Sequence, residues 1–441
     1  MPYPKSVTYF ALGSSGQPAQ KGSLMKKSFF ASALLLLILP FSSSSQPNGK
    51  LQLHFIDVGQ GDAEFVVSPK GETILIDGGL PGKDQVVNPY LATNHFTNID
   101  YYIASHYHND HIGCATRLMT ADRVQRLKAA YDRGDDPSDT DSYANPTTQN
   151  YLHAVQTKRV TASSSATGSG HKFKLDATSP NPVEVEFFAV NGNGHITNPE
   201  RNENDFSVAC VIRFGNFSAV LGGDLSGSSG SKYSDIETPC VPAFTAPVTV
   251  YKVHHHGSQY SSNPAWLQAI NPVVGIICCG AKNGYFLPHE DALQRLADSK
   301  IDTYWTEIGG QQNPDYHGAA TLTTHVPKAI ERPPDAGKHQ YVGGDIVVEV
   351  SPGSDTFDLT THAPQQTTTT ITYRFVKPAG QWGQRVTGTI PPPDDSSVVY
   401  KWSSNGRVYH LANCPTAALI RAKNLESGPV PPDLPPHSCV H

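Results

Sequence analysis

A chain of 441 residues can hold one large domain with appendages, or two domains. Its 33 lysines and arginines are outnumbered by 39 aspartates and glutamates, which gives a formal net charge of −6 with histidine neutral. This mild acidity, without any long basic run, argues against tight non-specific binding of nucleic acid, although not against its hydrolysis.

The first 46 residues have the pattern of a secretory leader. Lys26 and Lys27 precede an almost unbroken apolar run from Phe29 to Phe41, and four serines follow it. Because the run is shorter than the roughly 20 residues that a membrane span needs, we expect a signal peptide whose true start is Met25 and no further transmembrane domain. A buried core helix is the alternative. The expected location is therefore secreted or periplasmic.

Beyond the leader, short apolar segments alternate with turns that contain glycine. Strands are predicted at 51–58, 64–67, 73–76, 101–104, 183–190, 206–214, 217–221, 249–253, 273–278, 301–305 and 345–350, and helices at 114–120, 264–269 and 290–298. Strands that alternate with helices, with hairpins in each half, predict an α/β (α+β) fold of two mixed sheets with helices outside. Residues 132–170, rich in Asp, Ser, Thr and Gly, are interpreted as an excursion or lid over the site.

The composition divides the chain into four parts. After the leader (1–46), residues 50–352 are predicted to form the main domain. Residues 353–395, which contain a threonine run and three consecutive prolines, read as linker with one further strand candidate at 372–376. Residues 396–441 form a small tail rich in Cys and His.

The densest chemical signal is the run His106-Tyr107-His108-Asn109-Asp110-His111. Two histidines at i and i+2 on an extended strand end point to the same side, and an aspartate and a third histidine follow within one turn. Imidazole and carboxylate are the ligands that borderline divalent ions prefer. The run therefore predicts a metal site, with room for two ions that share a water molecule; a histidine-rich surface loop is the alternative.

Three more segments each join a strand to a glycine turn. Asp224 follows Gly222-Gly223, where the backbone can bend to bring a carboxylate between two cations. His256 follows the strand that ends at Val253. Asp77 ends an earlier strand, and we expect it to orient a histidine by hydrogen bonding rather than to bind metal. A turn-capping aspartate and a polar surface run are the alternatives for Asp224 and for the histidines at 254–256.

Taken in order, these motifs resemble the metallo-β-lactamase superfamily. The resemblance rests on Phe55-Ile56-Asp57-Val58-Gly59-Gln60-Gly61-Asp62, Leu75-Ile76-Asp77-Gly78-Gly79, the histidine run, Gly223-Asp224 and His255-His256-Gly257-Ser258. Within that superfamily the chain is most similar to the hydrolase domain of the competence protein ComEC and its free-standing secreted relatives. The similar region covers roughly residues 50–352. It implies a four-layer αββα sandwich with a dinuclear site at one end and, here, a small C-terminal appendage.

The resemblance also implies roles for the residues of the motifs. His106 and His108 would hold the first of two divalent ions, zinc or manganese, with iron also compatible with these ligands. Asp110, His111 and His256 would hold the second ion, and Asp224 would bridge. Asp110 and His255 are the catalytic candidates, with His255 free to contact a phosphoryl oxygen. The ions would make hydroxide available near neutral pH and stabilise charge on the attacked centre.

Two segments depart from the family pattern. Most members supply one more histidine to the first ion before the aspartate, and here only His195, or the amides of Asn202 and Asn204, precede the 206–214 strand. The family also often has Asn-x-Tyr-Gly-His-Pro after the last motif. The matching run begins at Asn283 and has leucine in place of that histidine, so His289, two positions on, is the candidate substitute.

The tail and the cysteines carry weaker signals. His410, Cys414, His437 and Cys439 could surround a structural zinc, but a Cys414–Cys439 disulfide is the competing interpretation and export favours it. The chain has seven cysteines, so at least one is unpaired or binds metal. Cys210 and the Cys278-Cys279 pair lie in apolar strand patterns and are expected to be buried thiols.

The sequence therefore predicts an exported metal-dependent hydrolase that cleaves phosphodiester bonds, in nucleic acid or a phosphorylated polymer, through a metal-bridged hydroxide. Members of the superfamily also hydrolyse lactams, lactones and thioesters at nearly the same site, so a β-lactamase or lactonase is the alternative within the class. A non-catalytic binding protein that retains the fold is the alternative from a different class. Retention of every core ligand argues against it, because a binder needs none of them.

Overall fold

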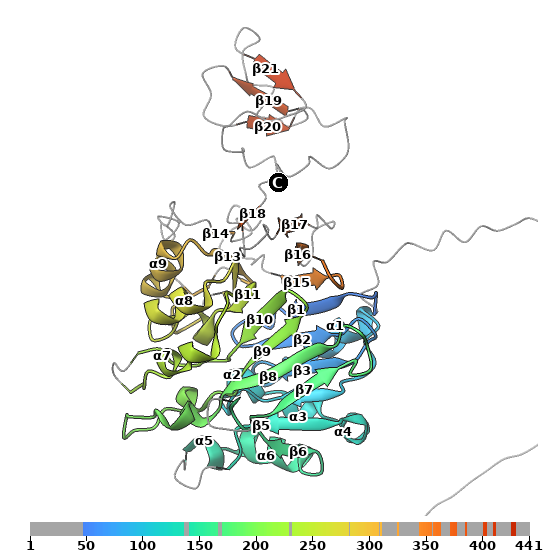
Figure 1. The fold of residues 1–441 in the computed structure, drawn as a ribbon, viewed down its shortest axis with the longest axis vertical. Coiled ribbons are helices and arrows are strands. Elements are labelled where there is room, and N and C mark those ends of the chain that lie inside the picture. The colour runs from blue at the N-terminus through green and yellow to red at the C-terminus, as the bar shows by residue number, and fades with distance from the viewer. Residues whose placement is uncertain are drawn as a thin grey trace, which may run out of the picture. The chain divides into compact units, whose positions relative to one another are not determined.

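The computed structural model describes residues 47–135, 141–165, 170–228, 232–281, 283–307, 309–310, 344–354 and 356–362, together with the backbone of short strands between residues 324 and 428. The described residues are built around two large mixed sheets packed face to face (Figure 1). The leader and the proposed start at Met25 lie outside the described residues.

The first sheet has ten strands in the order β18-β17-β16-β15-β1-β2-β3-β4-β5-β6. Its inner part, from β15 to β3, is antiparallel, and β3 to β6 are parallel. The bounds are β1 Leu51–Phe55, β2 Ala63–Val67, β3 Thr73–Asp77, β4 Tyr101–Ile103, β5 Ala129–Asp132, β6 Arg159–Thr161, β15 Asp345–Val350, β16 Thr356–His362, β17 Ile371–Val376 and β18 Gln384–Arg385.

The second sheet has eight strands in the order β14-β13-β12-β11-β10-β9-β8-β7. Its hairpin strands β7 to β10 are antiparallel, and β10 to β14 are parallel. The bounds are β7 Lys172–Leu175, β8 Val183–Ala189, β9 Ala209–Phe214, β10 Phe217–Leu221, β11 Val250–Lys252, β12 Val274–Ile277, β13 Asp302–Trp305 and β14 Thr324–His325.

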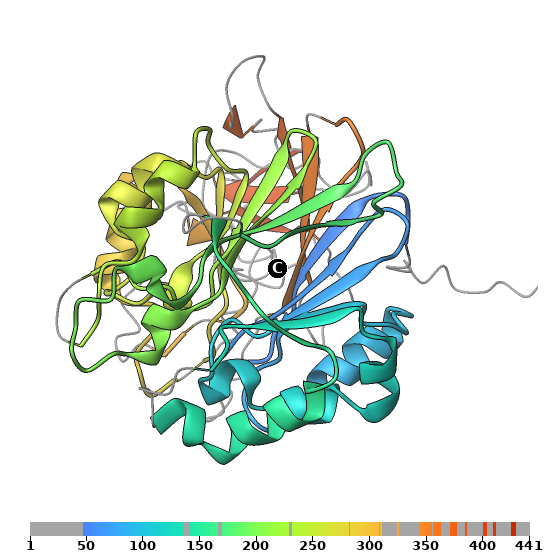
Figure 2. The ribbon, with the colours of Figure 1, turned by 60° about the horizontal axis from the view of Figure 1, so that its bottom comes forward.

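Helices cover the outer face of each sheet, as Figure 2 shows. Apolar side chains of the two inner faces form the central core, for example Leu53 and Ile76 against Phe187 and Ile212. The first sheet is covered by α1 Asp84–Thr93, α2 Asn109–Ile112, α3 Ala115–Leu118, α4 Ala121–Arg126, α5 Asp141–Ala144 and α6 Pro146–Val155. The second is covered by α7 Glu237–Cys240, α8 Pro264–Ile270 and α9 Glu290–Asp298. The expected αββα sandwich is confirmed.

The structure differs from the interpretation of residues 132–170 as a lid. That stretch contains the ten-residue helix α6 and the strand β6, both part of the first half. Asn145 begins α6 by accepting a hydrogen bond from the Thr147 backbone N–H (2.9 Å), and Tyr151 and Val155 are buried on one face. The amphipathic spacing was hidden by the polar composition around it.

The first sheet also continues beyond residue 352, where we expected linker. β16 pairs antiparallel with β15, and β17, at the position of the expected 372–376 strand, pairs with β16. Phe357 and Leu359 are buried in the central core, and their alternation with polar residues is the strand signal that the surrounding threonines obscured.

A third, three-stranded sheet lies in the tail. It consists of β19 Tyr400–Ser403, β20 Tyr409–Leu411 and β21 Leu425–Gly428, with β19 in the middle. His410 belongs to β20, while Cys414, His437 and Cys439 lie outside the described residues. None of the helices in the described ranges combines the length and apolar character needed to cross a bilayer.

Candidate metal centre

The predicted site residues come together where parallel strands of both sheets end. Asp77 closes β3, and the 106–111 turn follows the neighbouring parallel strand β4. In the other sheet Asp224 follows β10, and the 254–257 turn follows the parallel strand β11. Carboxyl ends of parallel strands lie at one edge of a sheet, so the topology gathers four segments that are far apart in sequence.

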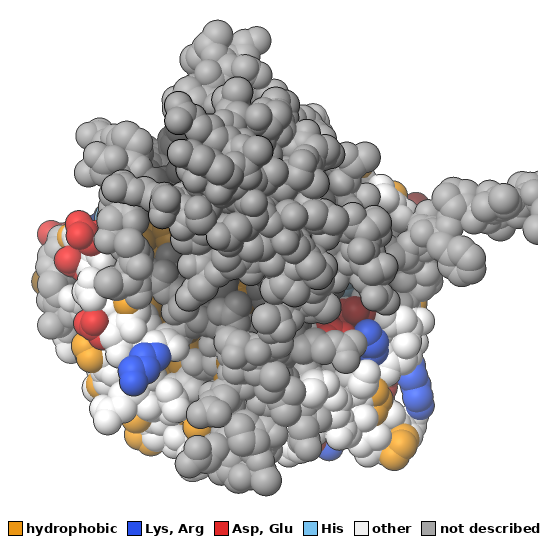
Figure 3. Space-filling view, turned by 90° about the horizontal axis from the view of Figure 1, so that it is seen from above, with side chains coloured by type: hydrophobic (Ala, Val, Ile, Leu, Met, Phe, Trp, Pro, Cys, Tyr) orange, Lys and Arg blue, Asp and Glu red, His pale blue; other side chains and the backbone are white. Residues whose placement is uncertain are grey.

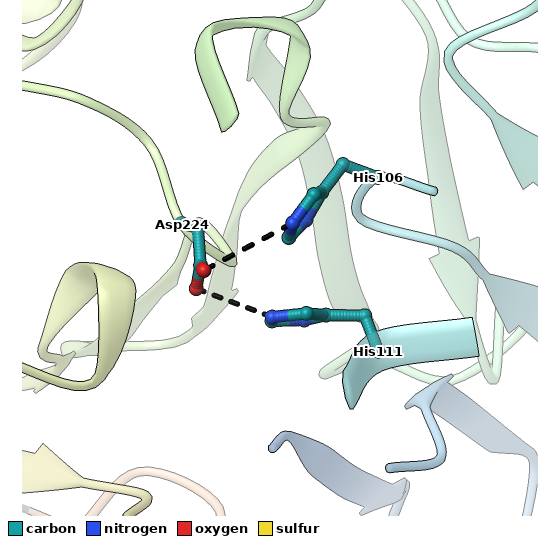
Figure 4. A group of neighbouring side chains, drawn as sticks. All are labelled: His106, His111 and Asp224. Carbon is teal, nitrogen blue, oxygen red and sulfur yellow. Dashed lines mark ion pairs between the residues drawn. The ribbon is translucent and has the colours of Figure 1, made fainter. Parts of the chain in front are cut away.

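Asp224 lies at the middle of this group. Its Oδ1 atom is 3.3 Å from His111 Nε2 and 3.5 Å from His256 Nε2, and its Oδ2 atom is 3.9 Å from His106 Nε2. Figure 4 shows the rings of His106 and His111 reaching the Asp224 carboxylate from the opposite half of the fold. The three histidines and Asp224 are all at least 98% buried.

Asp110 extends the group toward solvent. Its Oδ2 atom is 3.4 Å from His256 Nε2 and its Oδ1 atom is 4.0 Å from His111 Nε2, while its side chain is 21% exposed. Ligand atoms held 2.0–2.1 Å from one tetrahedral ion lie about 3.4 Å from each other. The spacing around Asp224, Asp110, His111 and His256 therefore suits shared cations better than direct hydrogen bonds.

The histidine ring orientations are fixed through their Nδ1 atoms. His111 Nδ1 donates to Asp77 Oδ2 (2.8 Å), and His256 Nδ1 donates to the Cys278 carbonyl (2.8 Å). Ser105 Oγ donates to Asp77 Oδ2 (2.6 Å), so it accepts from His106 Nδ1 (3.0 Å). With the proton on Nδ1 of each neutral ring, all three Nε2 lone pairs face the carboxylates.

The atoms at the centre support a fit to divalent cations. Within the described part of the chain, His111 Nε2, His256 Nε2 and Asp224 Oδ1 are buried and have no hydrogen-bond partner. Ligand atoms of His106, His111 and Asp224 lie within 4.8 Å of one another, and so do those of Asp110, His111 and His256. Buried polar atoms without partners are costly, and cations would satisfy them.

The charged groups at the centre shift one another's pKa values. Burial lowers the pKa of His256, but Asp224 and Asp62 outweigh burial and raise it to about 10. The same balance, with Asp224 and Asp77 as the main carboxylates, raises the pKa of His111. Burial raises the pKa of Asp224, yet His256 and His111 hold it well below its ordinary value. Asp224 is thus ionised, and a cation that enters must displace protons from histidine.

The remaining histidines of the motifs are close to the group. His108 Nδ1 lies 3.0 Å from His106 Nε2, so His108 meets the group through His106. His255 Nε2 lies 3.7 Å from Asp224 Oδ2 and receives a hydrogen bond from Asn204 Nδ2 (3.0 Å). Burial lowers the pKa of His255 to about 4, so this ring is neutral at pH 7 and can exchange hydrogen bonds without adding charge.

The candidate residues that precede the 206–214 segment lie in different places. Asn204 is buried and joins the centre through His255, and Asn202 accepts from the Asn204 backbone N–H (3.0 Å). His195 is exposed in the loop 191–201, and no interaction described for it reaches the cluster, so the geometry does not support it as a ligand. This loop lines a surface hollow through Asn191, Gly194, Ile196, Thr197, Asn198, Pro199 and Arg201.

The two other candidate residues, Asn283 and His289, lie in the loop after β12 and have structural roles there. Asn283 is buried and donates to the carbonyls of Gly280 (2.8 Å) and Leu287 (2.7 Å) while accepting from Leu287 N (2.9 Å). His289 precedes α9, and its Nδ1 accepts from Gln259 N (3.0 Å). Asn283 therefore shapes the loop, and neither side chain is described in contact with the metal cluster.

Sequence reasoning missed two buried charged residues behind the ligands. Asp62 and Lys252 form an ion pair, and each is 1% exposed. Asp62 Oδ1 lies 3.3 Å from His256 Nδ1, and the Asp62 backbone N–H donates to the Asp110 carbonyl (3.1 Å). A single lysine inside the apolar strand β11 was the available signal, because a buried ammonium requires a partner.

Glycine at position 61 lets this loop approach the histidine turn. Gly61 has φ +128°, and a Cβ atom there would lie 2.2 Å from the Asp110 carbonyl oxygen. Any larger residue would push the loop that carries Asp62 away from Asp110. The motif Gly59-Gln60-Gly61-Asp62 is thus required by close packing of two functional loops.

The described cysteines are all buried thiols. Cys210, Cys278 and Cys279 lie in the positions expected for buried strand residues, and Cys114 and Cys240 are buried as well. Cys414 and Cys439 lie outside the described residues, so the zinc and disulfide interpretations of the tail stay predictions.

Comparison with known proteins agrees with this geometry. Residues 56–281, just over half of the chain, match the sequence profile described as "Metallo-beta-lactamase superfamily". The chain is 26% identical over 297 residues to ComE operon protein 3 of Bacillus subtilis (strain 168), across 63% of this chain and 34% of that protein. It therefore spans about a third of the length of that relative.

Several solved structures are similar at low identity. The metallo-beta-lactamase fold protein YhfI from Bacillus subtilis is 13% identical, with 58% of this chain and 98% of that chain covered and a TM-score of 0.35. A diphosphatase from the PhnP family is 12% identical (68% and 99% covered, TM-score 0.33), and a long form RNase Z from yeast is 8% identical (56% and 39% covered, TM-score 0.33).

The matched region includes the histidine turn, Asp224 and the 254–257 turn, the segments that meet at the centre. The superfamily consists mainly of hydrolases, and its fold typically binds divalent metals at such His and Asp clusters. The two sheets with their outer helices, the ordered motifs and the sequence match lead to one conclusion: this chain belongs to the metallo-β-lactamase superfamily.

Proposed function

We propose that this protein is an exported metal-dependent hydrolase that cleaves phosphodiester bonds, in nucleic acid or in a phosphorylated polymer. One observation carries the proposal: three histidine Nε2 atoms converge on the Asp224 carboxylate from both halves of the fold. His106 and His108 would hold one cation and Asp110, His111 and His256 a second, with Asp224 shared. Such ions, zinc or manganese, supply Lewis-acid stabilisation and activation of water.

The side chains around the centre suit an anionic substrate. His255 and Asn204 form a neutral hydrogen-bonding pair beside Asp224, able to exchange hydrogen bonds with a phosphoryl oxygen. Asp110 is the partly exposed carboxylate of the group, positioned to accept a proton from the attacking water. The similarity to ComE operon protein 3 supports a function of this kind, although the whole activity of that longer protein is not carried over.

The net charge favours recognition near the bond that is cleaved. On the face seen in Figure 3, the described acidic and basic side chains lie in small separate groups. The net charge of −6 favours a substrate bound mainly through its phosphoryl group at the metal centre. Export is proposed from the pattern of residues 26–45.

The experiment is a substrate panel with defined metal content. Purified mature protein, loaded with Zn²⁺ or Mn²⁺, is expected to turn over bis-(p-nitrophenyl) phosphate and single-stranded DNA, and to lose that turnover with chelator. Asp110→Ala and His108→Ala are each expected to reduce kcat by at least about 100-fold. His195→Ala, which removes an exposed histidine outside the cluster, is the control and should retain full activity.

Two results would contradict the proposal. Turnover that survives chelation would remove the metal mechanism. Hydrolysis of a chromogenic β-lactam or a lactone, with no phosphodiester cleavage under either metal, would assign the same centre to the other hydrolase class.

A further inference from the structure

Lys252 is a buried cation next to a site built for cations. It ends β11, two residues before the 254–257 turn, and its side chain is 1% exposed. No other lysine in the described ranges is buried. Because an ammonium in a protein interior needs compensation, its partners should show why the fold retains it.

The partners of Lys252 belong to the other loops of the metal centre. Its Nζ atom forms an ion pair with Asp62, in the loop before β2, and donates to the Gly223 carbonyl (3.2 Å), the residue before Asp224. Asp62 in turn faces His256 Nδ1 at 3.3 Å and His111 Nδ1 at 3.7 Å. One buried charge therefore contacts, directly or through Asp62, every segment that supplies ligands around Asp224.

Asp62 also has the position of a ligand. Its carboxylate lies within 4.8 Å of ligand atoms of Asp224 and His256, a spacing that would allow all three to bind one cation. Lys252 pairs with Oδ2 of this carboxylate, and without the ammonium the carboxylate would be available for a divalent ion. The ammonium thus competes with metal for Asp62.

On the proposed function, and resting on it, we infer that Lys252 is a positioning residue: it holds Asp62 out of the metal coordination, so that Asp62 faces the Nδ1 atoms of His256 and His111 instead of binding a cation. The pair also keeps the Asp224 turn fixed through the Gly223 carbonyl. Two carboxylates that both lie close to His256 consequently have different roles. Asp224 is shared between cations, and the charge of Asp62 is neutralised by Lys252.

The test uses Co²⁺ in place of the native ion, because its visible absorption reports coordination number and ligand type. In Lys252→Met, Asp62 is freed to coordinate, so the Co²⁺ spectrum of the protein should change toward higher coordination. In the double variant Asp62→Asn/Lys252→Met the added carboxylate is gone, and the spectrum should return to that of the unmodified protein. Lys252→Arg keeps the ion pair and should keep the spectrum.

Controls separate this role from simple destabilisation. Arg213→Met breaks another ion pair, with Glu186 on the neighbouring strand β8 (2.8 Å), away from the described ligands; it should lower the melting temperature slightly and leave the Co²⁺ spectrum unchanged. If Lys252→Met does not fold, Lys252→Gln, which can still donate to the Gly223 carbonyl, takes its place with the same expected spectrum. Asp62→Asn alone should weaken the apparent Co²⁺ affinity about 10- to 100-fold.

The outcomes distinguish the two proposals. An unchanged spectrum in the charge-neutral Lys252 variant, with Co²⁺ bound by the unmodified protein, overturns the role of Lys252 and leaves the hydrolase proposal standing. If the Lys252→Met spectrum changes as expected but the unmodified protein cleaves no phosphodiester, the positioning role of Lys252 is supported and the proposed substrate class is overturned. Failure of the unmodified protein to bind Co²⁺ overturns both.

Discussion

Each histidine around Asp224 is held by its Nδ1 atom, and this determines that Nε2 is the nitrogen that faces the Asp224 carboxylate. Asp77 contributes most to the arrangement, because it accepts from the Ser105 backbone N–H (2.8 Å), from Ser105 Oγ and from His111 Nδ1. It is fully buried and has φ +57°, a conformation that aspartate and asparagine tolerate better than most residues.

Asp77→Asn is expected to lower the affinity for the divalent ions about 10- to 100-fold, because an amide nitrogen cannot accept the proton of His111 Nδ1. Competition with a chromophoric chelator measures the change. Asp100→Asn is the matched control: its carboxylate accepts from the Thr73 backbone N–H (2.9 Å) away from the cluster. Equal losses in the two variants would show that the effect is general instability.

The stabilisation that metal confers should depend on pH. Asp224 and Asp62 raise the pKa of His256 to about 10 against the effect of burial. In the metal-free protein, the stability from that proton is fully present below the ordinary histidine pKa of about 6.5 and is lost as the pH rises through about 10. Metal binding must displace the proton, so apparent affinity should rise up to about tenfold per pH unit for each proton released.

The measurement is the rise in melting temperature on addition of Mn²⁺ at pH 6.5, 7.5 and 8.5, each against metal-free protein at the same pH. The rise should grow with pH. A rise that stays constant over this window would mean that His256 is not protonated in the metal-free state.

At this scale the sequence predicts which residues meet around Asp224, but not the residues that support them. Spacing in the histidine run, and glycines before Asp224 and after His256, depend only on local chain geometry. The Lys252–Asp62 pair joins residues 190 positions apart, so it becomes visible only after the two halves fold together. His195 was a candidate by order in the chain alone, and the loop that carries it points it to solvent.

Among the elements, the loop from Gly280 to His289 combines exposure with strain. Tyr285 is 69% exposed and Phe286 is 44% exposed. Phe286 has φ +61°, where the related family pattern has glycine. The loop is tied to the metal-binding turn, since His289 N donates to the Gly257 carbonyl (2.8 Å). A side chain in the left-handed region costs about 1–2 kcal/mol relative to glycine.

Phe286→Gly is expected to leave the free energy of unfolding unchanged or to raise it by up to about 1 kcal/mol, because relief of strain exceeds the added chain entropy. Tyr285→Gly, one position earlier without a positive φ, should instead lower it by roughly 0.5–1 kcal/mol. Urea denaturation of both variants gives the comparison. Equal destabilisation by the two substitutions would contradict the strain argument.

Element prediction succeeded where apolar residues follow a clear period. The strands from β8 to β13 and the helices α8 and α9 were expected near their observed bounds. α6 and β16 were missed because polar residues dominate their segments, and their buried faces depend on contacts made by the folded sheet.

Across the whole molecule, the centre belongs to neither half alone. The first half contributes the histidine run and Asp77, and the second contributes Asp224 and His256. In the chain, the two sets of motifs lie on either side of the hairpin strands β7 to β10, so each half of the fold supplies one set. The extent of the first sheet could not be predicted, since pairing of β16 with β15 depends on which edge the folded sheet leaves open.

That pairing bears on how the protein can be shortened. A fragment ending at residue 352 would lose Phe357 and Leu359 from the interior and leave the β15 backbone bare along one side. Exposed strand edges pair with other chains, so such a fragment is expected to self-associate, as measured by light scattering. A fragment ending at residue 386, which keeps β16, β17 and β18, should stay monodisperse. If a fragment of residues 50–352 were chosen from the motifs alone, its aggregation would reflect the exposed edge of β15, not low stability of the domain itself.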